Sequence, residues 1–309
     1  MRAQGKCVRM SVWIKALRVN QWTKNAVVFA AWFFAFADAS QAAHSRGWRP
    51  FLLTCAMAGA FSLVSSAFYL LNDVSDYEAD RLHPVKKNRP IAADLISKID
   101  AVRAALAVFA VGLAFPCYLV FRHPDRTWGF AVILVYTLMQ CAYSGFLKRI
   151  PYIDVAVIAA GFVLRAVAGA AAIGARISPW LLVCTFGLSL FLALCKRRHE
   201  KSVAEASRKA LAGYHPVVLD VLICLSAIGT FAVYMCYTLA ADTVARFHTH
   251  GLAFTGLFVA LGLLRYIFLL RGRGDVGRPE KILFSDRILW AIFFGYAVTA
   301  VLAVLIVRM

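Results

Sequence analysis

The chain has 309 residues, of which 61% are hydrophobic and 16% are charged, and its formal net charge is +18 at pH 7. A soluble domain is about half apolar, with roughly a quarter of its residues charged. This composition excludes an ordinary soluble protein. Because apolar segments recur from end to end, we expect a single membrane domain over residues 1–309.

Nine segments are long and apolar enough to be predicted as transmembrane helices, since crossing the hydrocarbon core takes about 20 helical residues. They are residues 22–38, 50–71, 99–121, 128–147, 152–173, 179–195, 216–240, 251–270 and 288–307. The first follows a basic stretch, residues 1–20, but has no convincing signal-peptide cleavage site, so we interpret it as a span. The predicted fold is an all-α bundle of about nine transmembrane helices.

The charged residues are distributed unevenly between the two sides of this predicted bundle. With the N-terminus placed inside, 24 of the 34 Lys and Arg residues fall on the inner side, which predicts a cytoplasmic N-terminus. Of the 16 acidic residues, 13 lie on the same side. Anionic lipids would attract the basic residues but give no reason for the carboxylates. We therefore expect a polar working site at the cytoplasmic face and no nucleic-acid partner.

An acidic segment ends the second predicted span. At about 100° per residue, one helical face carries the side chains of Asn72, Asp73, Asp76 and Asp80, whereas Glu78 points away. Carboxylates that share a face repel one another, and oxygen ligands with open positions for phosphate suit Mg²⁺. We predict a Mg²⁺–diphosphate site in which these four residues are metal ligands and the three aspartates are catalytic. The alternative is a solvated, salt-bridged loop.

A basic loop follows within the motif region, residues 73–98. We expect Pro84 and Pro90 to fix its direction and to place Lys86 and Arg89 over the acidic face. A site for Mg²⁺ and a diphosphate also needs cations on the phosphate oxygens. The alternative is that these cations simply neutralise the aspartates. His83 is expected to be structural.

The motif resembles the first signature of the UbiA superfamily of intramembrane prenyltransferases. The resemblance rests on Asn72, Asp76 and Asp80 followed by His-Pro-x-Lys-x-x-Arg-Pro-Ile-Ala, and it agrees with nine helices. Other segments are similar to one branch, the decaprenyl-phosphate phosphoribosyltransferases. These segments are residues 17–25, 143–148, Asp154 with 161–165, 196–200, and 277–280 with Asp286. The resemblance covers nearly the whole chain.

One position departs from the members that prenylate aromatic acceptors. They carry a second aspartate-rich motif after the sixth helix, where this chain has Cys195-Lys-Arg-Arg-His-Glu200. A second acidic set would hold another Mg²⁺ on a prenyl diphosphate, whereas Lys and Arg suit a ligand with more phosphate. We interpret Lys196, Arg197 and Glu200 as binding residues. The alternative is the ordinary excess of Lys and Arg on the cytoplasmic side of a membrane protein, which does not explain Glu200.

Further candidate residues lie on the fifth and first predicted spans. Asp154 and Arg165 are eleven residues apart and so share one helical face, where ionisable groups indicate function. A structural ion pair is the alternative. We expect Arg165, Lys148 and Lys196 to bind phosphates, and Asp154 to bind a sugar hydroxyl or a metal-bound water. The remaining predicted binding residues are Tyr143, Gln21, Lys24 and Asn25.

The resemblance implies transfer of 5-phosphoribosyl from phosphoribosyl pyrophosphate to a polyprenyl phosphate, with Mg²⁺ as cofactor and release of pyrophosphate. Two alternatives stay open: prenyl transfer from a diphosphate to an aromatic or other acceptor, and, more distantly, an anion transporter. The expected location is a bacterial inner membrane, with the active site facing the cytoplasm. A homo-oligomer is compatible with the sequence.

Overall fold

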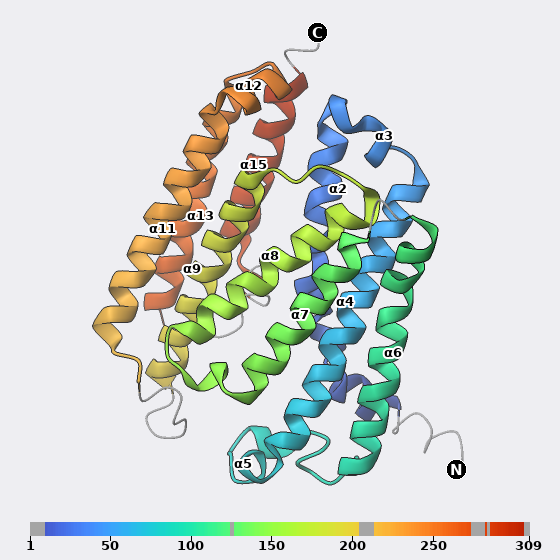
Figure 1. Ribbon diagram of the computed structural model, residues 1–309. Helices are drawn as coiled ribbons and strands as arrows, with labels where there is room; N and C mark the ends of the chain where they lie inside the picture. Colours follow the sequence, from blue (N-terminus) through green and yellow to red (C-terminus); the bar gives the residue numbers. More distant parts are fainter. Residues whose placement is uncertain (1–9, 124–126, 204–212, 273–281, 283–284, 306–309) are drawn as a thin grey trace. The chain divides into compact units, whose positions relative to one another are not determined.

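The computed structural model describes residues 10–123, 127–203, 213–272, 282 and 285–305 (Figure 1). No strand occurs in this part of the chain, so the all-α fold class is confirmed. Eight of its helices are long and apolar enough to cross a membrane. They are α4 (Trp48–Ser75), α6 (Lys98–Arg122), α7 (Trp128–Gly145), α8 (Ile153–Ile173), α9 (Pro179–Val203), α11 (Pro216–Leu239), α13 (Thr255–Arg271) and α15 (Arg287–Leu305). The span that contains α13 begins in the preceding 3₁₀-helix, at Gly251.

The first predicted span, residues 22–38, is not one continuous α-helix. It consists of the 3₁₀-helix η1 (Val19–Val27) and the ten-residue helix α2 (Val28–Ala37). At 1.5 Å per residue, α2 covers about 15 Å, half of the hydrocarbon core. The first half is polar, and the Thr23 hydroxyl donates to the backbone carbonyl of Asn20 at 3.4 Å, a local bond that competes with regular helical hydrogen bonds. The count of nine is therefore not confirmed.

The other described elements are short. They are η2 (Ala39–Gln41), α3 (Ala42–Ser45), α5 (Tyr77–Arg81), η3 (Lys86–Asn88), η5 (Leu147–Arg149), α12 (Ala241–Phe247) and η6 (Gly251–Phe254). The chain divides into two compact units. Unit 1 comprises Met1–Phe34, His44–Gly145 and Leu164–Ala175, and unit 2 comprises Ala35–Ala43, Phe146–Val163 and Arg176–Met309. Boundaries between the units fall within α2, α3 and α8.

In unit 1, α4 and α6 run side by side (Figure 1). Their approach is close: a Cβ added at Gly112 of α6 would lie 3.0 Å from a methyl group of Val64 on α4. Helix α6 begins at its N-cap Ser97, whose hydroxyl accepts a hydrogen bond from the backbone N–H of Asp100. Ile91 of the basic loop is fully buried in the same core, so the loop is anchored beside the end of α4.

In unit 2, helix α9 packs against α11, and α13 packs against α15. The buried side chains include Phe191 and Tyr266, whose rings meet edge to face with centroids 5.7 Å apart. Other large apolar side chains of the long helices are exposed, among them Leu106, Ile228 and Phe294. Exposed apolar surface on spanning helices is typical of a face in contact with lipid.

Candidate active site

The acidic motif lies where α4 gives way to α5. Asp76 is the residue between the two helices, with φ −90° and ψ 7°, and its N–H still donates to the carbonyl of Asn72 at 2.8 Å. Asp73 and Asp80 are buried, with 3% and 1% of their surface exposed. Glu78 is exposed and forms an ion pair with Lys98 at 3.4 Å. The prediction that Glu78 points away from the other acids is confirmed.

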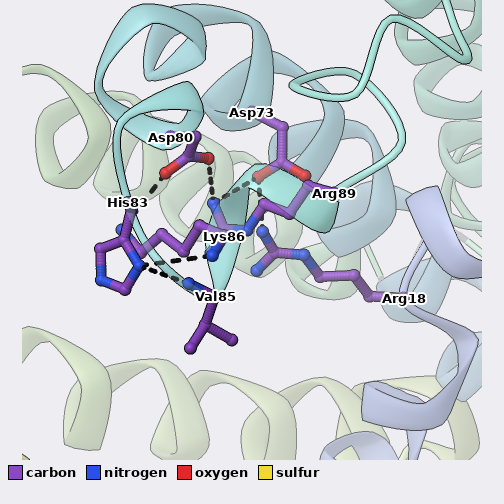
Figure 2. A network of polar contacts seen from close by, with 7 residues as sticks. All are labelled: Arg18, Asp73, Asp80, His83, Val85, Lys86 and Arg89. Carbon is purple, nitrogen blue, oxygen red and sulfur yellow. Dashed lines mark hydrogen bonds and ion pairs between the residues drawn. The ribbon is translucent and has the colours of Figure 1, made fainter.

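Arg89 joins the two buried carboxylates (Figure 2). Its NH1 lies 3.0 Å from Oδ1 of Asp73 and 2.5 Å from Oδ2 of Asp80. Nζ of Lys86 lies 3.3 Å from the other Asp80 oxygen, Oδ1. The expected placement of Lys86 and Arg89 over the acidic face is confirmed.

His83 shapes the loop that carries these cations. Its Nδ1 accepts hydrogen bonds from the backbone N–H groups of Val85 at 3.2 Å and Lys86 at 3.3 Å (Figure 2). A ring nitrogen that accepts two backbone bonds is in its neutral, unprotonated form. This contact supports the structural role expected for His83.

Arg18 is a member of this cluster that the sequence prediction of site residues missed. Its NH2 lies 2.5 Å from Oδ1 of Asp73 (Figure 2). Its guanidinium also stacks 4.6 Å from the ring centroid of Tyr69. Arg18 also has a left-handed backbone, with φ 52°, at the start of η1. Such a conformation is uncommon for a residue with a side chain. The only sequence signal was its place in the segment over residues 17–25.

The residues at this site fit a divalent cation bound together with phosphate. Among the described residues, no three His, Cys, Asp or Glu side chains form a ready metal cluster. Mg²⁺, however, is commonly bound by one or two carboxylates, waters and substrate phosphates. Asp73 and Asp80 provide two carboxylates, and Oδ1 of Asp80 is buried and accepts no hydrogen bond from a described residue. The nearby Lys86 ammonium forms an ion pair with that oxygen but is not aligned for a hydrogen bond.

A pocket of about 370 Å³ opens beside this cluster in unit 1. Its volume is at the lower end of the range for small-molecule sites, about 300–1,000 Å³. It is lined by Ser11, Ile14, Lys15, Arg18, Asn20, Gln21, Asp73, Arg89 and Pro90. The pocket therefore combines three residues of the cluster with the N-terminal segment, including the predicted binding residue Gln21.

A second polar group of unit 1 surrounds Arg165, whose surface is 7% exposed. Its Nε donates to Oδ1 of Asn25 at 2.7 Å, and its NH2 donates to the hydroxyl of Tyr136 at 2.8 Å. The Asn25 amide donates in turn to Ser62, and Ser65 lies 3.0 Å from the Tyr136 hydroxyl. Two predicted residues, Asn25 and Arg165, thus meet directly. Sequence reasoning missed Tyr136, Ser62 and Ser65.

The close approach of α8 to α2 makes this contact possible. A Cβ added at Gly169 would lie 1.9 Å from the carbonyl oxygen of Val28, so only glycine fits there. Gly169 is one turn after Arg165, and Val28 is three residues after Asn25. The predicted residues Gln21 and Lys24 bond to each other nearby in the chain, with Lys24 Nζ 3.0 Å from Gln21 Oε1.

In unit 2, Asp154 is buried and pairs with Arg197 of α9. Oδ2 accepts a hydrogen bond from Nε of Arg197 at 2.8 Å and forms an ion pair with NH2 at 2.8 Å. Oδ1 accepts from the Tyr214 hydroxyl and the N–H of Val155. NH1 of Arg197 reaches Glu200 at 2.6 Å. The structural ion pair considered for Asp154 therefore exists, but with Arg197 as its partner.

Tyr214 is a further member of the Asp154–Arg197 cluster, and nothing in the sequence indicated that it belongs there. Burial and the hydrogen bond to the Asp154 carboxylate raise the pKa of the Tyr214 hydroxyl far above its usual value, so it stays a donor. Its oxygen also accepts from the N–H of Tyr152, a residue with a left-handed φ of 67°. The two rings pack edge to face at 4.7 Å. The cluster thus holds the start of α8 against the loop before α11.

The remaining predicted residues have the following places. Tyr143 lies partly exposed near the end of α7 in unit 1, and Lys148 in η5 and Lys196 on α9 belong to unit 2. Asp286 forms an ion pair with Arg265 at 2.6 Å and accepts from the N–H of Leu289, which caps the start of α15. Residues 277–280 lie outside the described part of the chain.

These features define a multi-pass membrane protein in which buried carboxylates are held by Arg and Lys beside a pocket. Residues 26–289 match the family model described as the UbiA prenyltransferase family. The chain is 36% identical to a decaprenyl-phosphate phosphoribosyltransferase of Corynebacterium glutamicum, over 96% of this chain and 87% of the relative. It is 35% identical to the enzyme of that name from Mycobacterium tuberculosis, over 94% and 93%.

Solved structures agree on the fold. A UbiA homolog from Archaeoglobus fulgidus, bound to GPP and Mg²⁺, superimposes with a TM-score of 0.67 at 18% identity, covering 95% of this chain and 96% of that one. A digeranylgeranylglyceryl phosphate synthase structure gives a TM-score of 0.64 at 12% identity, covering 96% and 98%. The chain belongs to the UbiA prenyltransferase family, and the predicted resemblance is confirmed.

Proposed function

We propose that this chain transfers the 5-phosphoribosyl group from phosphoribosyl pyrophosphate to a polyprenyl phosphate such as decaprenyl phosphate, releasing pyrophosphate. The relatives that match almost the whole chain carry the name decaprenyl-phosphate phosphoribosyltransferase. The observation that carries the proposal is the Arg197 cluster at the place of a second acidic motif. Asp154 and Glu200 hold the Arg197 guanidinium in position there, which suits an anionic ligand more than a second metal ion.

The reaction requires little proton transfer. An oxygen of the lipid phosphate forms a bond to C1 of the ribose, and the bond from C1 to the pyrophosphate oxygen breaks, with its electron pair leaving on the pyrophosphate. The lipid phosphate is already an anionic nucleophile, so a general base is unnecessary. The chief task of the protein is to hold the two phosphates together and to compensate the charge of the leaving group.

We propose the following roles for the polar residues. Arg89 and Lys86 bind the diphosphate, and Arg165, Lys148 and Lys196 bind phosphate oxygens of the two substrates. Asp154 positions Arg197 rather than touching substrate, because both of its carboxylate oxygens already accept hydrogen bonds from the protein. Residues that line the substrate are Gln21, Lys24, Asn25, Tyr143, Arg197 and Glu200.

The metal expected for this activity is Mg²⁺, held by Asp73, Asp76 and Asp80 with Asn72 nearby. When bound, it neutralises negative charge on the diphosphate and so favours its departure. The buried Asp80 oxygen without a hydrogen bond supports this assignment. We further propose that the site faces the cytoplasm of a bacterial inner membrane, as the distribution of Lys and Arg indicates.

A membrane assay with two labelled donors tests the proposal. Membranes containing the protein and decaprenyl phosphate are given labelled phosphoribosyl pyrophosphate or labelled prenyl diphosphate, and the lipid product is identified by mass spectrometry. We expect a phosphoribosylated lipid from the first donor only. Consumption of prenyl diphosphate alone would instead support the alternative, prenyl transfer.

A matched pair of variants tests the site. Asp80→Asn removes a buried carboxylate next to Arg89 and should lower turnover by at least 100-fold, the order of effect of losing a charged catalytic group. Glu78→Gln changes an exposed carboxylate two residues away and should leave turnover within twofold of wild type. Equal effects of the two substitutions would contradict the proposed site.

A further inference from the structure

The pocket beside Asp73 is lined in large part by residues 11–21, of which the proposed chemistry uses only Gln21. Its cations are Lys15, Arg18 and Arg89, and its one carboxylate is Asp73. Arg18 and Arg89 both bind that carboxylate, so the charge of Asp73 is already compensated. The excess positive charge of the lining favours an anionic ligand in the pocket.

The cations keep donors that the protein does not use. A guanidinium has five N–H donors and an ammonium has three. Within the described chain, Arg18 donates only from NH2, to Asp73, and Arg89 only from NH1, to Asp73 and Asp80. Lys15 donates to the carbonyl of Asn88 at 3.0 Å. Most donors of the three side chains therefore remain for a ligand.

Two amide side chains in the same lining suit hydroxyl groups. The Asn20 amide makes no hydrogen bond to a described residue, and Gln21 uses only its carbonyl oxygen, which accepts from Lys24. An amide both donates and accepts, as pairing with a sugar hydroxyl requires. At about 370 Å³, the pocket has room for a small organic molecule rather than a bare ion.

We propose that this pocket binds the phosphate-monoester end of a sugar phosphate, with Lys15 and Arg18 on the phosphate and Asn20 and Gln21 on the sugar hydroxyls. The inference rests on the proposed function, since the sugar phosphate would be the phosphoribosyl donor. Its diphosphate end would lie toward Arg89 and the Asp73–Asp80 carboxylates. The N-terminal segment would then select a donor that carries a phosphate monoester in addition to its diphosphate, and a prenyl diphosphate has no such monoester.

Titration calorimetry on the full chain in detergent tests this, with four probes: ribose 5-phosphate, inorganic phosphate, inorganic pyrophosphate with Mg²⁺, and farnesyl phosphate. Lys15→Gln should weaken ribose 5-phosphate and inorganic phosphate on the order of tenfold, as the loss of one charge-assisted hydrogen bond predicts. Asn20→Ala should weaken ribose 5-phosphate alone, by a few-fold. Lys87→Gln is the matched control, because Lys87 is exposed in the basic loop next to Asn88, the residue that Lys15 contacts, and does not line the pocket.

Each other result overturns the proposal. If Lys15→Gln weakens pyrophosphate as much as ribose 5-phosphate, then Lys15 only supports the loop through Asn88. If farnesyl phosphate is the ligand selectively weakened, the pocket receives the lipid phosphate instead. Unchanged binding in both variants, or no binding of ribose 5-phosphate to wild type, also overturns it. The transfer assay separates failure of this proposal from failure of the proposed function. If wild type transfers phosphoribosyl while both variants bind ribose 5-phosphate normally, only the proposal for the pocket is wrong.

Discussion

Replacing Asp154 with asparagine tests whether this residue positions Arg197 or contacts substrate. The substitution keeps the size of the side chain and an oxygen that can accept from Tyr214 and Val155. It removes the negative charge that Arg197 contacts through Nε and NH2, both at 2.8 Å. If Asp154 is a positioning residue, the protein should lose stability, and the loss should depend on Arg197.

The magnitude follows from what remains around Arg197. Removing one partner of a buried ion pair costs about 3–5 kcal/mol when the other charge is left uncompensated. Arg197 keeps Glu200, whose Oε2 lies 2.6 Å from NH1, and 15% of its side chain is exposed. Because the remaining charge is partly compensated and partly solvated, we expect a loss of about 2–3 kcal/mol.

The assay is a double-mutant cycle on the free energy of unfolding in mixed micelles. It compares wild type, Asp154→Asn, Arg197→Met and the double variant. We expect the double variant to be less destabilised than the sum of the single ones by about 1–2 kcal/mol, since each single substitution breaks the same contact. Additive losses, or an Asp154→Asn protein that is as stable as wild type yet inactive, would refute a positioning role.

Two further substitutions test the contacts around Arg165. Gly169→Ala places a Cβ against the Val28 carbonyl and should lower the free energy of unfolding by about 1–3 kcal/mol. The control, Gly59→Ala, has open space at its Cβ and should be neutral or slightly stabilising. Equal unfolding free energies of the two variants would contradict the close approach of α8 to α2. Tyr136→Phe removes the hydroxyl that accepts from Arg165 and should cost about 1–3 kcal/mol, measured by the same unfolding assay; an unchanged value would mean that the hydroxyl does not stabilise the guanidinium.

The features that depend on short stretches of sequence were predicted correctly. Apolar length alone identified eight helices, since the bilayer fixes that length whatever the packing. Helical periodicity separated Glu78 from Asp73 and Asp80, and Lys86 and Arg89 lie over the acids as expected from the basic loop that follows them. The roles of these residues stay predictions.

The features that the sequence did not predict depend on the local backbone or on distant partners. Arg18 reaches Asp73 from a left-handed backbone, a conformation that no pattern indicates for arginine. The first predicted span was interpreted from its average hydropathy, although its polar first half forms a 3₁₀-helix. Tyr136 and Tyr214 are ordinary aromatic residues in the sequence, and only tertiary packing brings them to Arg165 and Asp154.

The four aspartates that are buried in the described part of the chain share one arrangement: Asp38, Asp73, Asp80 and Asp154 each pair with an arginine. A carboxylate without a partner in such a place would cost several kcal/mol, so compensation is required before any ligand arrives. Arginine and a metal ion compete for the same carboxylate oxygens. Arg89 contacts Oδ1 of Asp73 and Oδ2 of Asp80, so a metal ion would compete with it for these two oxygens, and a diphosphate would give the guanidinium another anionic partner.

This competition predicts opposite effects of Arg89→Met on the two ligands. Without the guanidinium, Mg²⁺ alone should bind more tightly, because the two carboxylates lose one competing cation and keep only their pairs with Arg18 and Lys86 among the contacts described. Pyrophosphate should bind more weakly, because a phosphate-binding cation is lost; each change should be on the order of tenfold, as for one charge-assisted contact. Titration calorimetry measures both, with Lys87→Met as the control in the same exposed loop. If both affinities fall, Arg89 organises the carboxylates for the metal, and the competition inferred from its contacts at 3.0 Å and 2.5 Å is wrong.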